Sequence, residues 1–244
     1  MDNKDLNTSK ISKGLPNSFS NIVLVDCMDT ILYRDISLDY LFVLWAKKMG
    51  KEFNIYYKFL LYYRREVVKG KMHNTVPIDD IYGEIYDHCN YFGLIQACPK
   101  DLFISKAHNI ELSIELKHHH LRKDTAAYLR NAKSNNSLIY CVSDFRLPSF
   151  DINQFFSNLG IENLFTKVFS SCDIGKTKKR GDLYEYVIES IHKNPSECIM
   201  IGDNKKSDCV NANKYGINSY WLDISTASKI HLLTSKLKSL LTYI

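Results

Sequence analysis

Five short apolar segments, each followed by polar or acidic residues, constrain the fold of this 244-residue chain more than any other feature. They span residues 21–25, 137–142, 166–171, 197–201 and 217–222. Short continuous apolar runs are typical of strands buried on both faces of a parallel sheet. Segments with helical periodicity connect the last four runs, so the pattern predicts βα units and a five-stranded parallel sheet.

The apolar periodicity between these runs predicts the helices of the same layer structure. The expected helices cover Lys123–Ala132, Asp151–Leu159, Gly181–His192 and Lys206–Tyr215. A further amphipathic helix is expected at the C-terminus, where Ile230, Leu233 and Leu237 share one face with later apolar residues.

Residues 37–116 follow a different pattern, because no strand-like run ends in an acid there. Four helical patterns occur instead, near Phe42–Met49, Tyr56–Val68, Ile78–Cys89 and Ile104–Leu116. We therefore predict an all-helical cap over 37–116, inserted into a core formed by 18–36 and 117–244. The second helix is rich in aromatic residues, which we expect to pack inward; an interfacial membrane anchor is the alternative.

Composition restricts the function to a few classes. With 32 Lys and Arg against 27 Asp and Glu, the net charge of +5 permits an anionic substrate. There is no long basic run, so nucleic-acid binding is not expected. No apolar stretch approaches the ~20 residues of a membrane span, and the N-terminus has no apolar signal core, so stable membrane insertion is not expected. Seven cysteines without a CxxC pair indicate reduced thiols in a cytoplasmic protein and disfavour zinc.

Polar clusters follow four of the predicted strands. Their chemistry-bearing residues are Asp26, Asp29 and Thr30; Ser143 and Asp144; the lysines of SSCDIGKTKKRGD; and Asp203, Asn204, Ser207 and Asp208. An acid after a strand often only caps the next helix. The carboxyl ends of parallel strands converge at one edge, however, so four such clusters in this order predict a ligand site there.

These clusters resemble the four motifs of the haloacid dehalogenase (HAD) superfamily of aspartate-nucleophile phosphotransferases. The resemblance extends over about 21–34 and 122–222. It implies an α/β fold, with a Rossmann-like three-layer core and a helical cap, and a Mg²⁺-dependent phosphatase or phosphotransferase. Such an enzyme acts on a small phosphorylated metabolite through an aspartyl phosphate.

The first motif reads D-C-M-D-T-I-L-Y-R and is similar to the D-x-F-D-T-L-L-x-R of a bacterial subgroup. Members of that subgroup often accompany or are fused to glycosyltransferases of surface polysaccharide synthesis. The resemblance therefore implies association with such proteins and a sugar- or polyol-linked substrate.

The same resemblance assigns the metal site and the nucleophile. Asp26 would attack phosphorus and, with Asp203 and the backbone carbonyl of Met28, hold Mg²⁺. Asp208 would contact the metal directly or orient its waters. Oxygen ligands of this kind suit Mg²⁺.

The remaining motif residues would bind or neutralise phosphate. Ser143 and the backbone amide of Asp144 would bind phosphoryl oxygens, and Thr30 would brace the loop after the nucleophile. Lys178 is the best candidate for the charge-neutralising lysine, with Lys176 and Lys179 as rivals in the same loop.

One position departs from the superfamily pattern. Many of its phosphatases carry an aspartate two residues after the nucleophile as general acid, and here that residue is Met28. Asp29 lies one residue later, and we favour a structural role for it over a catalytic one. The departure keeps two alternatives open: a dehalogenase-type hydrolase, and a catalytically weak or inactive binding module.

Several polar residues outside the motifs have two interpretations. His118–His120 are expected to form a solvated linker, since three adjacent histidines cannot all point at one ion. Arg34 and Arg146 could contact the substrate, or Arg34 could pair with Asp35 or Asp39. Glu111 and Glu115, at helical spacing, could cap the site or face solvent.

Overall fold

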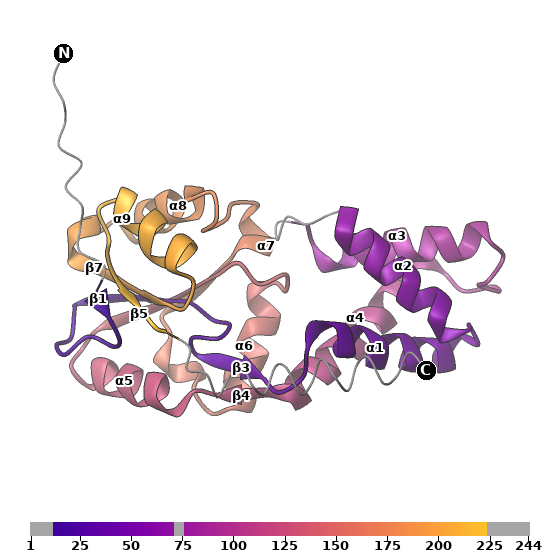
Figure 1. The fold of residues 1–244 in the computed structure, drawn as a ribbon, viewed down its shortest axis with the longest axis horizontal. Coiled ribbons are helices and arrows are strands. Elements are labelled where there is room, and N and C mark those ends of the chain that lie inside the picture. The colour runs from indigo at the N-terminus through magenta and orange to yellow at the C-terminus, as the bar shows by residue number, and fades with distance from the viewer. Residues whose placement is uncertain (1–11, 71–75, 224–244) are drawn as a thin grey trace, which may run out of the picture.

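The computed structural model describes residues 12–70 and 76–223, and it shows an elongated molecule made of an α/β core and a helical cap (Figure 1). The core contains the parallel sheet with helices on both faces. The cap is a bundle of four helices at the other end of the molecule. The predicted fold class is therefore confirmed.

The central sheet has six parallel strands in the order β1-β8-β7-β2-β5-β6. The strands are β1 (Ser12–Lys13), β2 (Ile22–Val25), β5 (Leu138–Ser143), β6 (Lys167–Ser170), β7 (Cys198–Gly202) and β8 (Asn218–Trp221). All four residues of β2 are buried, as are all five of β7, because helices cover both faces of the sheet. The five apolar runs of the sequence form five of these strands, β2 and β5 to β8.

The expectation of five strands was wrong by one. The additional strand, β1, pairs Ser12 with Tyr220 and Lys13 with Trp221 at the edge of the sheet. Its two residues are polar, with Ser12 partly buried and Lys13 exposed, so it is held by backbone hydrogen bonds rather than by an apolar face. No hydrophobic pattern marks such a strand in a sequence.

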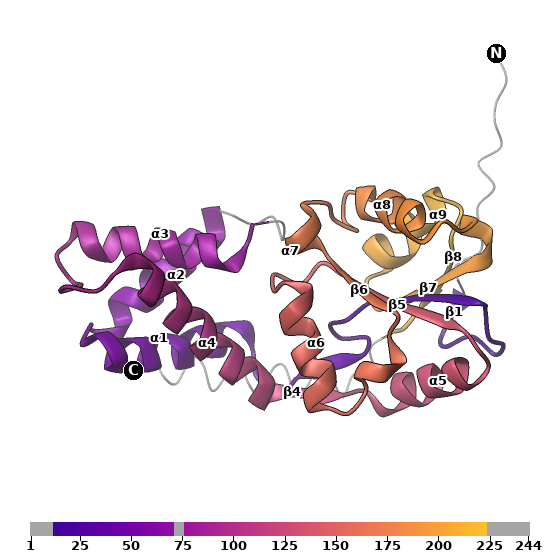
Figure 2. The same ribbon diagram turned by 180° about the vertical axis from the view of Figure 1, so that it is seen from behind.

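Helices cover the two faces of the sheet, as Figures 1 and 2 show from opposite sides. On one face lie α7 (Ser171–Ile174), α8 (Asp182–Ile191) and α9 (Asn211–Lys214), and on the other lie α5 (Lys123–Ser134) and α6 (Ser149–Asn158). Short 3₁₀ turns occupy Glu162–Leu164 and Pro195–Glu197, and a π-helical turn (η3) covers Lys205–Val210 just before α9. These bounds agree with the expected helices to within a few residues.

The cap consists of α1 (Leu38–Phe53), α2 (Tyr57–Gly70), α3 (Ile78–Tyr91) and α4 (Lys100–His118). Helix α1 begins after Ser37, whose hydroxyl accepts from the Tyr40 amide, and ends at Asn54 in the left-handed conformation. Trp45, buried on α1, donates its indole N–H to the Ala107 carbonyl of α4, 3.0 Å away. The four expected cap helices are therefore present, each longer than its apolar pattern indicated.

The expectation that the aromatic residues of α2 pack inward was only partly right. Its buried face is formed by Leu60, Leu61 and Val67, whereas Phe59 and Tyr62 are about half exposed. The aliphatic residues occupy the stripe that faces α1 and α3, so the aromatic side chains between them turn outward.

A two-stranded antiparallel sheet connects core and cap. It pairs β3 (Leu32–Arg34) with β4 (His119–Leu121), so the chain leaves the core and returns to it side by side. The solvated linker expected at His118–His120 was therefore wrong in part: His119 is buried, and both flanking histidines bond the carboxylate of Asp35 at 2.7 and 3.0 Å.

The expected C-terminal helix lies outside the described residues. Within the part of the chain that is described, no helix is both long and apolar enough to cross a bilayer. All seven cysteines are free thiols.

Candidate active site

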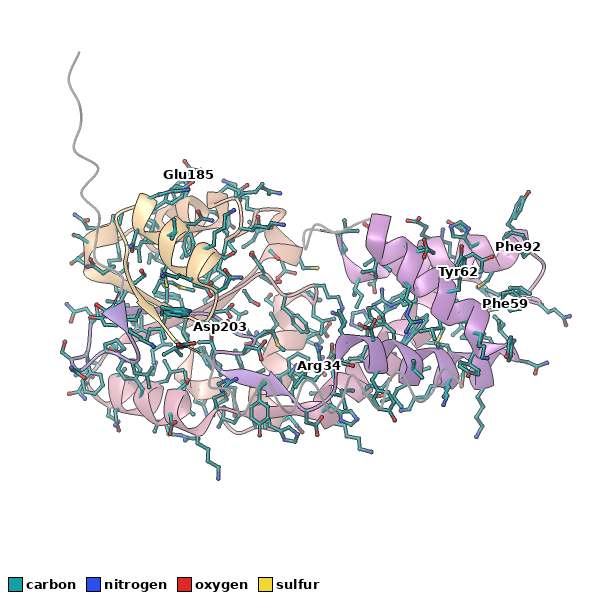
Figure 3. The ribbon with its side chains drawn as sticks, viewed as in Figure 1. Arg34, Phe59, Tyr62, Phe92, Glu185 and Asp203 are labelled. Carbon is teal, nitrogen blue, oxygen red and sulfur yellow. The ribbon has the colours of Figure 1, made fainter. Side chains whose placement is uncertain are left out.

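Three adjacent strands, β7, β2 and β5, bring three of the predicted clusters to one edge of the sheet. Asp26 follows β2 directly, and its amide donates to the Ile201 carbonyl of β7 at 2.9 Å. Asp203 follows β7, and Ser143 ends β5. Together with Lys178 and Asp208 they line a cavity of about 330 Å³. Figure 3 shows Asp203 within the core, well away from the outer end of the cap.

The loop after β2 is folded tightly around the nucleophile candidate. The amides of Ile31 and Leu32 both donate to the Cys27 carbonyl, at 3.0 and 2.9 Å. Thr30 is fully buried, and its hydroxyl lies 3.3 Å from a carboxylate oxygen of Asp26 and 3.3 Å from one of Asp203. With a single proton it donates to one of the two at a time, so Thr30 links the first and fourth motifs.

The loop after β7 is shaped around the Asp208 carboxylate. One oxygen accepts from the Asn204 amide at 2.9 Å and the other from the Lys178 ammonium at 2.7 Å. A Cβ atom at Gly202 would lie 2.3 Å from that carboxylate, so only glycine fits at the end of the strand. Asn204 caps the π-helical turn by accepting from the amides of Lys206 and Ser207.

Lys178 and Lys179 both line the cavity, and the candidate lysine that bonds the site aspartates is Lys178. Its ammonium is buried and bonds both Asp26 and Asp208. Lys176 instead lies 3.8 Å from Glu185 on α8, and Lys179 is exposed. The side chain of Asn211 donates to the Lys178 and Lys179 carbonyls, both at 2.9 Å, and so fixes the loop that aims the ammonium.

The residues after β5 form the opposite wall. Ser143 is buried, and its hydroxyl accepts from the Phe145 amide at 3.1 Å. The Asp144 carboxylate accepts from the amides of Lys178 and Lys179, at 2.8 and 3.1 Å. Asp144 thus joins the second motif to the lysine loop, a role that its sequence position did not indicate.

The electrostatics of the cavity favour a divalent cation. Asp26, Asp203 and Asp208 each offer a carboxylate oxygen, and these three oxygens lie within 4.8 Å of one another. Against three carboxylates stands one ammonium, that of Lys178, so the fully ionised group carries a charge of −2. Burial and the neighbouring carboxylates raise the pKa of Asp203 to about 6, and burial raises that of Asp26 well above its usual value despite Lys178. The donor set and the charge both fit Mg²⁺.

Met28 and Asp29 lie side by side at the edge of the cavity, and both contribute to its lining. Asp29 has a left-handed backbone (φ 59°), and it also lines a second cavity, of about 440 Å³, beside Tyr33 and Arg122. Burial raises the pKa of Asp29, while Arg122 and Arg34 partly oppose that effect. The Asp29 carboxyl therefore borders the candidate site. Within the described part of the chain, it forms no hydrogen bond with Asp26.

Sequence reasoning missed Asn211 and two aromatic supporting residues. Trp221 donates its indole N–H to the Asp203 carbonyl at 2.8 Å, and Tyr184 donates its hydroxyl to the Ser207 carbonyl at 3.0 Å. Both act on backbone groups of the fourth motif loop. No residue pattern in one sequence distinguishes such aromatic side chains from ordinary core residues.

The parallel sheet, the helical cap after the first strand and the carboxylate–lysine cluster at the strand ends define a HAD-type hydrolase architecture. The model of the haloacid dehalogenase-like hydrolase family matches residues 21–210. The chain therefore belongs to this family. No curated protein matches the sequence closely enough to count as a relative.

Solved structures of this family share the fold at low sequence identity. A 2-haloacid dehalogenase from Pseudomonas syringae pv. Tomato DC3000 has 13% identity and a TM-score of 0.58, covering 93% of this chain and 100% of its own. A HAD phosphatase from Thermococcus onnurineus has 17% identity and a TM-score of 0.57, with coverages of 83% and 86%. The HAD-hydrolase YfnB from Bacillus subtilis, solved bound to magnesium, has 16% identity and a TM-score of 0.57, with coverages of 89% and 100%.

Proposed function

We propose that this protein is a Mg²⁺-dependent phosphatase or phosphotransferase that acts on a small phosphorylated metabolite through an aspartyl phosphate at Asp26. The observation that carries the proposal is the Lys178 ammonium, which bonds both Asp26 and Asp208 where the carboxylates of Asp26, Asp203 and Asp208 converge. A carboxylate nucleophile and a phosphoryl group are both negative and repel each other, and the ammonium weakens this repulsion.

In this mechanism a carboxylate oxygen of Asp26 attacks phosphorus, the bond to the leaving oxygen breaks, and water later hydrolyses the acyl phosphate. Lys178 orients the attacking carboxylate and offsets negative charge on the phosphoryl oxygens. Ser143 and the Asp144 amide supply hydrogen bonds to those oxygens. Thr30 holds Asp26 and Asp203 in register through its hydroxyl.

Asp26, Asp203 and the Met28 carbonyl would hold Mg²⁺ in this proposal. Both carboxylate oxygens of Asp208 already accept hydrogen bonds, one from the Asn204 amide and one from Lys178. These bonds favour a role for Asp208 in orienting metal-bound water. The cation, when bound, supplies positive charge to the phosphoryl oxygens.

The decisive experiment is Asp26→Asn, which removes the nucleophile with almost no change in volume. We expect turnover of p-nitrophenyl phosphate with Mg²⁺ to fall to background, while circular dichroism and the melting temperature show a folded protein. Asp173→Asn, a change in α7 outside the cavity, is the matched control and should keep its activity. A folded Asp26→Asn variant with retained turnover would exclude the aspartyl-phosphate mechanism.

The absence of an acid at Met28 favours a second candidate, a dehalogenase-type hydrolase, since that reaction also uses an aspartate nucleophile and needs no general acid. It needs no metal either, whereas the three converging carboxylates suit one. Halide release from 2-haloacids without Mg²⁺ would favour this candidate, and a folded protein inactive towards both substrate types would favour a binding module.

The resemblance of the first motif to the D-x-F-D-T subgroup supports a narrower proposal. In it, the enzyme works beside glycosyltransferases of polysaccharide synthesis on a sugar- or polyol-linked phosphate. A Mg²⁺-dependent screen of sugar and polyol phosphates tests this, and uniform low activity on all of them would contradict it.

A further inference from the structure

Five charged side chains form a buried cluster where the cap meets the core; we call Arg34, Arg64, Arg146, Glu111 and Glu115 the junction cluster. Their side chains are between 0 and 15% exposed. Arg34 comes from the connecting strand β3, Arg146 from the loop after β5, and the other three from cap helices α2 and α4. Figure 3 shows Arg34 between the core and the cap.

Hydrogen bonds tie the cluster together through its two glutamates. Glu115 accepts two bonds from Arg34, at 2.8 and 3.0 Å, and one from Arg146 at 2.9 Å. Glu111 accepts from Arg146 and from Arg64, each at 2.7 Å, and from the Tyr82 hydroxyl at 2.7 Å. The helix α4 of the cap thereby holds the loop that carries the second motif.

The cluster contains one positive charge more than its acids neutralise. Three guanidinium groups face two carboxylates, and the surrounding arginines keep the pKa of Glu111 at about 2, so it is ionised. His119, beside Glu115, adds nothing at neutral pH, because burial lowers its pKa to about 4. Buried charge without a counterion is costly.

Among residues 12–70 and 76–223, the three arginines form hydrogen bonds with no Asp or Glu other than Glu111 and Glu115. Aromatic rings contact Arg64 at 4.6 to 5.6 Å and Arg146 at 5.4 and 5.8 Å, and so stabilise both cations. Arg64 is fully buried, so among the three guanidinium groups those of Arg34 and Arg146 are the ones that a solute can reach.

Those two arginines also keep donors available. Their Nε and Nη2 atoms bond the glutamates, whereas the Nη1 of each donates to no acceptor among residues 12–70 and 76–223. Their side chains remain 13 and 15% exposed. Both Nη2 atoms bond the same oxygen of Glu115, so the two guanidinium groups lie close together.

The pair borders the candidate active site. Phe145, which precedes Arg146, lines the catalytic cavity, as does Asp29, where burial raises the pKa and the charge of Arg34 partly opposes that rise. A phosphoryl group at Asp26 would place the rest of its substrate toward this junction with the cap.

We infer that Arg34 and Arg146 bind a second anionic group of the substrate, a carboxylate or a second phosphate, on the leaving-group side. This inference rests on the proposed phosphatase function. It narrows the substrate class to phosphate esters that carry another negative charge. Glu111 and Glu115 position the two arginines for it, and the bidentate geometry of guanidinium suits either anion.

The test compares 3-phosphoglycerate with glycerol 3-phosphate, in which a hydroxymethyl group replaces the carboxylate. With Mg²⁺, we expect wild-type kcat/KM to favour the acid by about 10- to 100-fold, the range of a charge-assisted hydrogen bond. Arg146→Gln should bring that ratio close to 1, and Arg146→Lys should restore part of it. Arg130→Gln, an exposed change on α5, should leave the wild-type ratio unchanged.

Arg146→Gln is expected to fold, because it leaves two arginines facing two glutamates. Should it prove unstable, Arg34→Gln removes the same excess charge and provides the same comparison. A wild-type ratio near 1, or a ratio equal in wild type and both folded variants, would overturn the inference.

Failure of the proposed function has a different signature. Absence of hydrolysis of both compounds and of p-nitrophenyl phosphate would reject the phosphatase. The calorimetric affinities of the same two compounds then test the arginine pair directly. Tighter binding of the acid that is lost in Arg146→Gln would support the pair, and equal affinities would overturn it.

Discussion

Lys178 is the residue whose position most depends on partners far away in the sequence. Three lysines within residues 176–179 have the same local character, so the sequence left the choice among them open. The structure distinguishes them because Asn211 and Asp144 fix the backbone of that loop and direct one side chain to Asp26. The motif aspartates were predictable from the strand ends, whereas the contacts that orient them were not.

Because Met28 stands where many related phosphatases have a general acid, we expect the rate to depend steeply on the pKa of the leaving group. General acid catalysis contributes about 10²- to 10⁴-fold, and a thioether cannot deliver the proton. Steady-state kinetics should show p-nitrophenyl phosphate cleaved at least about 10²-fold faster than alkyl phosphates. Met28→Asp should narrow that gap.

Asp29→Asn provides the control, because a structural Asp29 leaves the aryl rate nearly unchanged. If wild type cleaves both classes equally fast and Asp29→Asn slows only the alkyl esters, Asp29 is itself the acid. Our preference for a structural role would then be wrong.

Gly202→Ala tests how the fourth motif loop is shaped. The added Cβ would overlap the Asp208 carboxylate, so that side chain must move and release Lys178. We expect kcat to fall by about 10²-fold, as a displacement of 1 Å near the chemistry can do, with a stability loss of ~1–3 kcal/mol. Kinetics and thermal unfolding measure both. Gly83→Ala in α3 should keep full activity, since its Cβ would meet the end of the flexible Lys100 side chain at 3.3 Å and Ile104 at an ordinary contact distance of 3.6 Å.

At the scale of helices and strands, hydrophobic patterning located strands β2 and β5 to β8 and the longer helices, and it failed where other forces act. Edge strand β1 has no apolar residue, and the short β3–β4 pair depends on backbone hydrogen bonds and on Asp35 between two histidines. The exposed aromatic residues of α2 show a further limit. A helix rich in both aliphatic and aromatic residues has more apolar surface than its neighbours can cover, and sequence alone does not say which part remains outside.

Helices α4 and α6 are joined by His108, and this contact predicts a pH-dependent stability. The imidazole lies 2.7 Å from Asp79 on α3 and 2.7 Å from Asp151 on α6, and these carboxylates raise its pKa from 6.5 to about 10. The folded state therefore retains a proton that the unfolded state loses. The contribution is complete below about pH 6.5 and is lost as the pH rises toward 10.

Melting temperatures measured from pH 6 to 10 should thus fall more steeply in wild type than in His108→Gln. His192→Asn is the control, since asparagine tolerates the left-handed conformation at that helix end. Parallel pH profiles for wild type and His108→Gln would contradict the assignment.

For the whole molecule, the layers and the inserted cap followed from the sequence, but the way the two parts join did not. Arg34 and Glu115 are 81 positions apart, and Arg146 and Glu111 are 35 apart. Each of these residues has an ordinary local context. Their pairing depends on where the β3–β4 connection places α4 against the core, which no local pattern encodes.

Magnesium should stabilise the whole protein, and the effect should depend on pH. Without metal, the raised pKa of Asp203 means that folded-state stability declines as the pH rises from about 3.8 to about 6. Mg²⁺ binds the ionised carboxylates, so it should raise the melting temperature most above pH 6, by about 5–10 °C at 100-fold excess over its Kd. Differential scanning calorimetry with Mg²⁺ or EDTA measures this. A shift of the same size in Asp203→Asn would place the cation elsewhere.

The pairing of Arg34 with His119 means that the two ends of the cap meet at one point. If a short turn joined Arg34 directly to His119, the whole helical bundle could be removed without interrupting the core. Recombination could therefore exchange one cap for another in a single event. Such an exchange also removes Glu111 and Glu115, and leaves Arg34 and Arg146 without their acidic partners. Any successor bundle must therefore bring its own carboxylates to the same two arginines, which makes this junction a compatibility requirement for new caps.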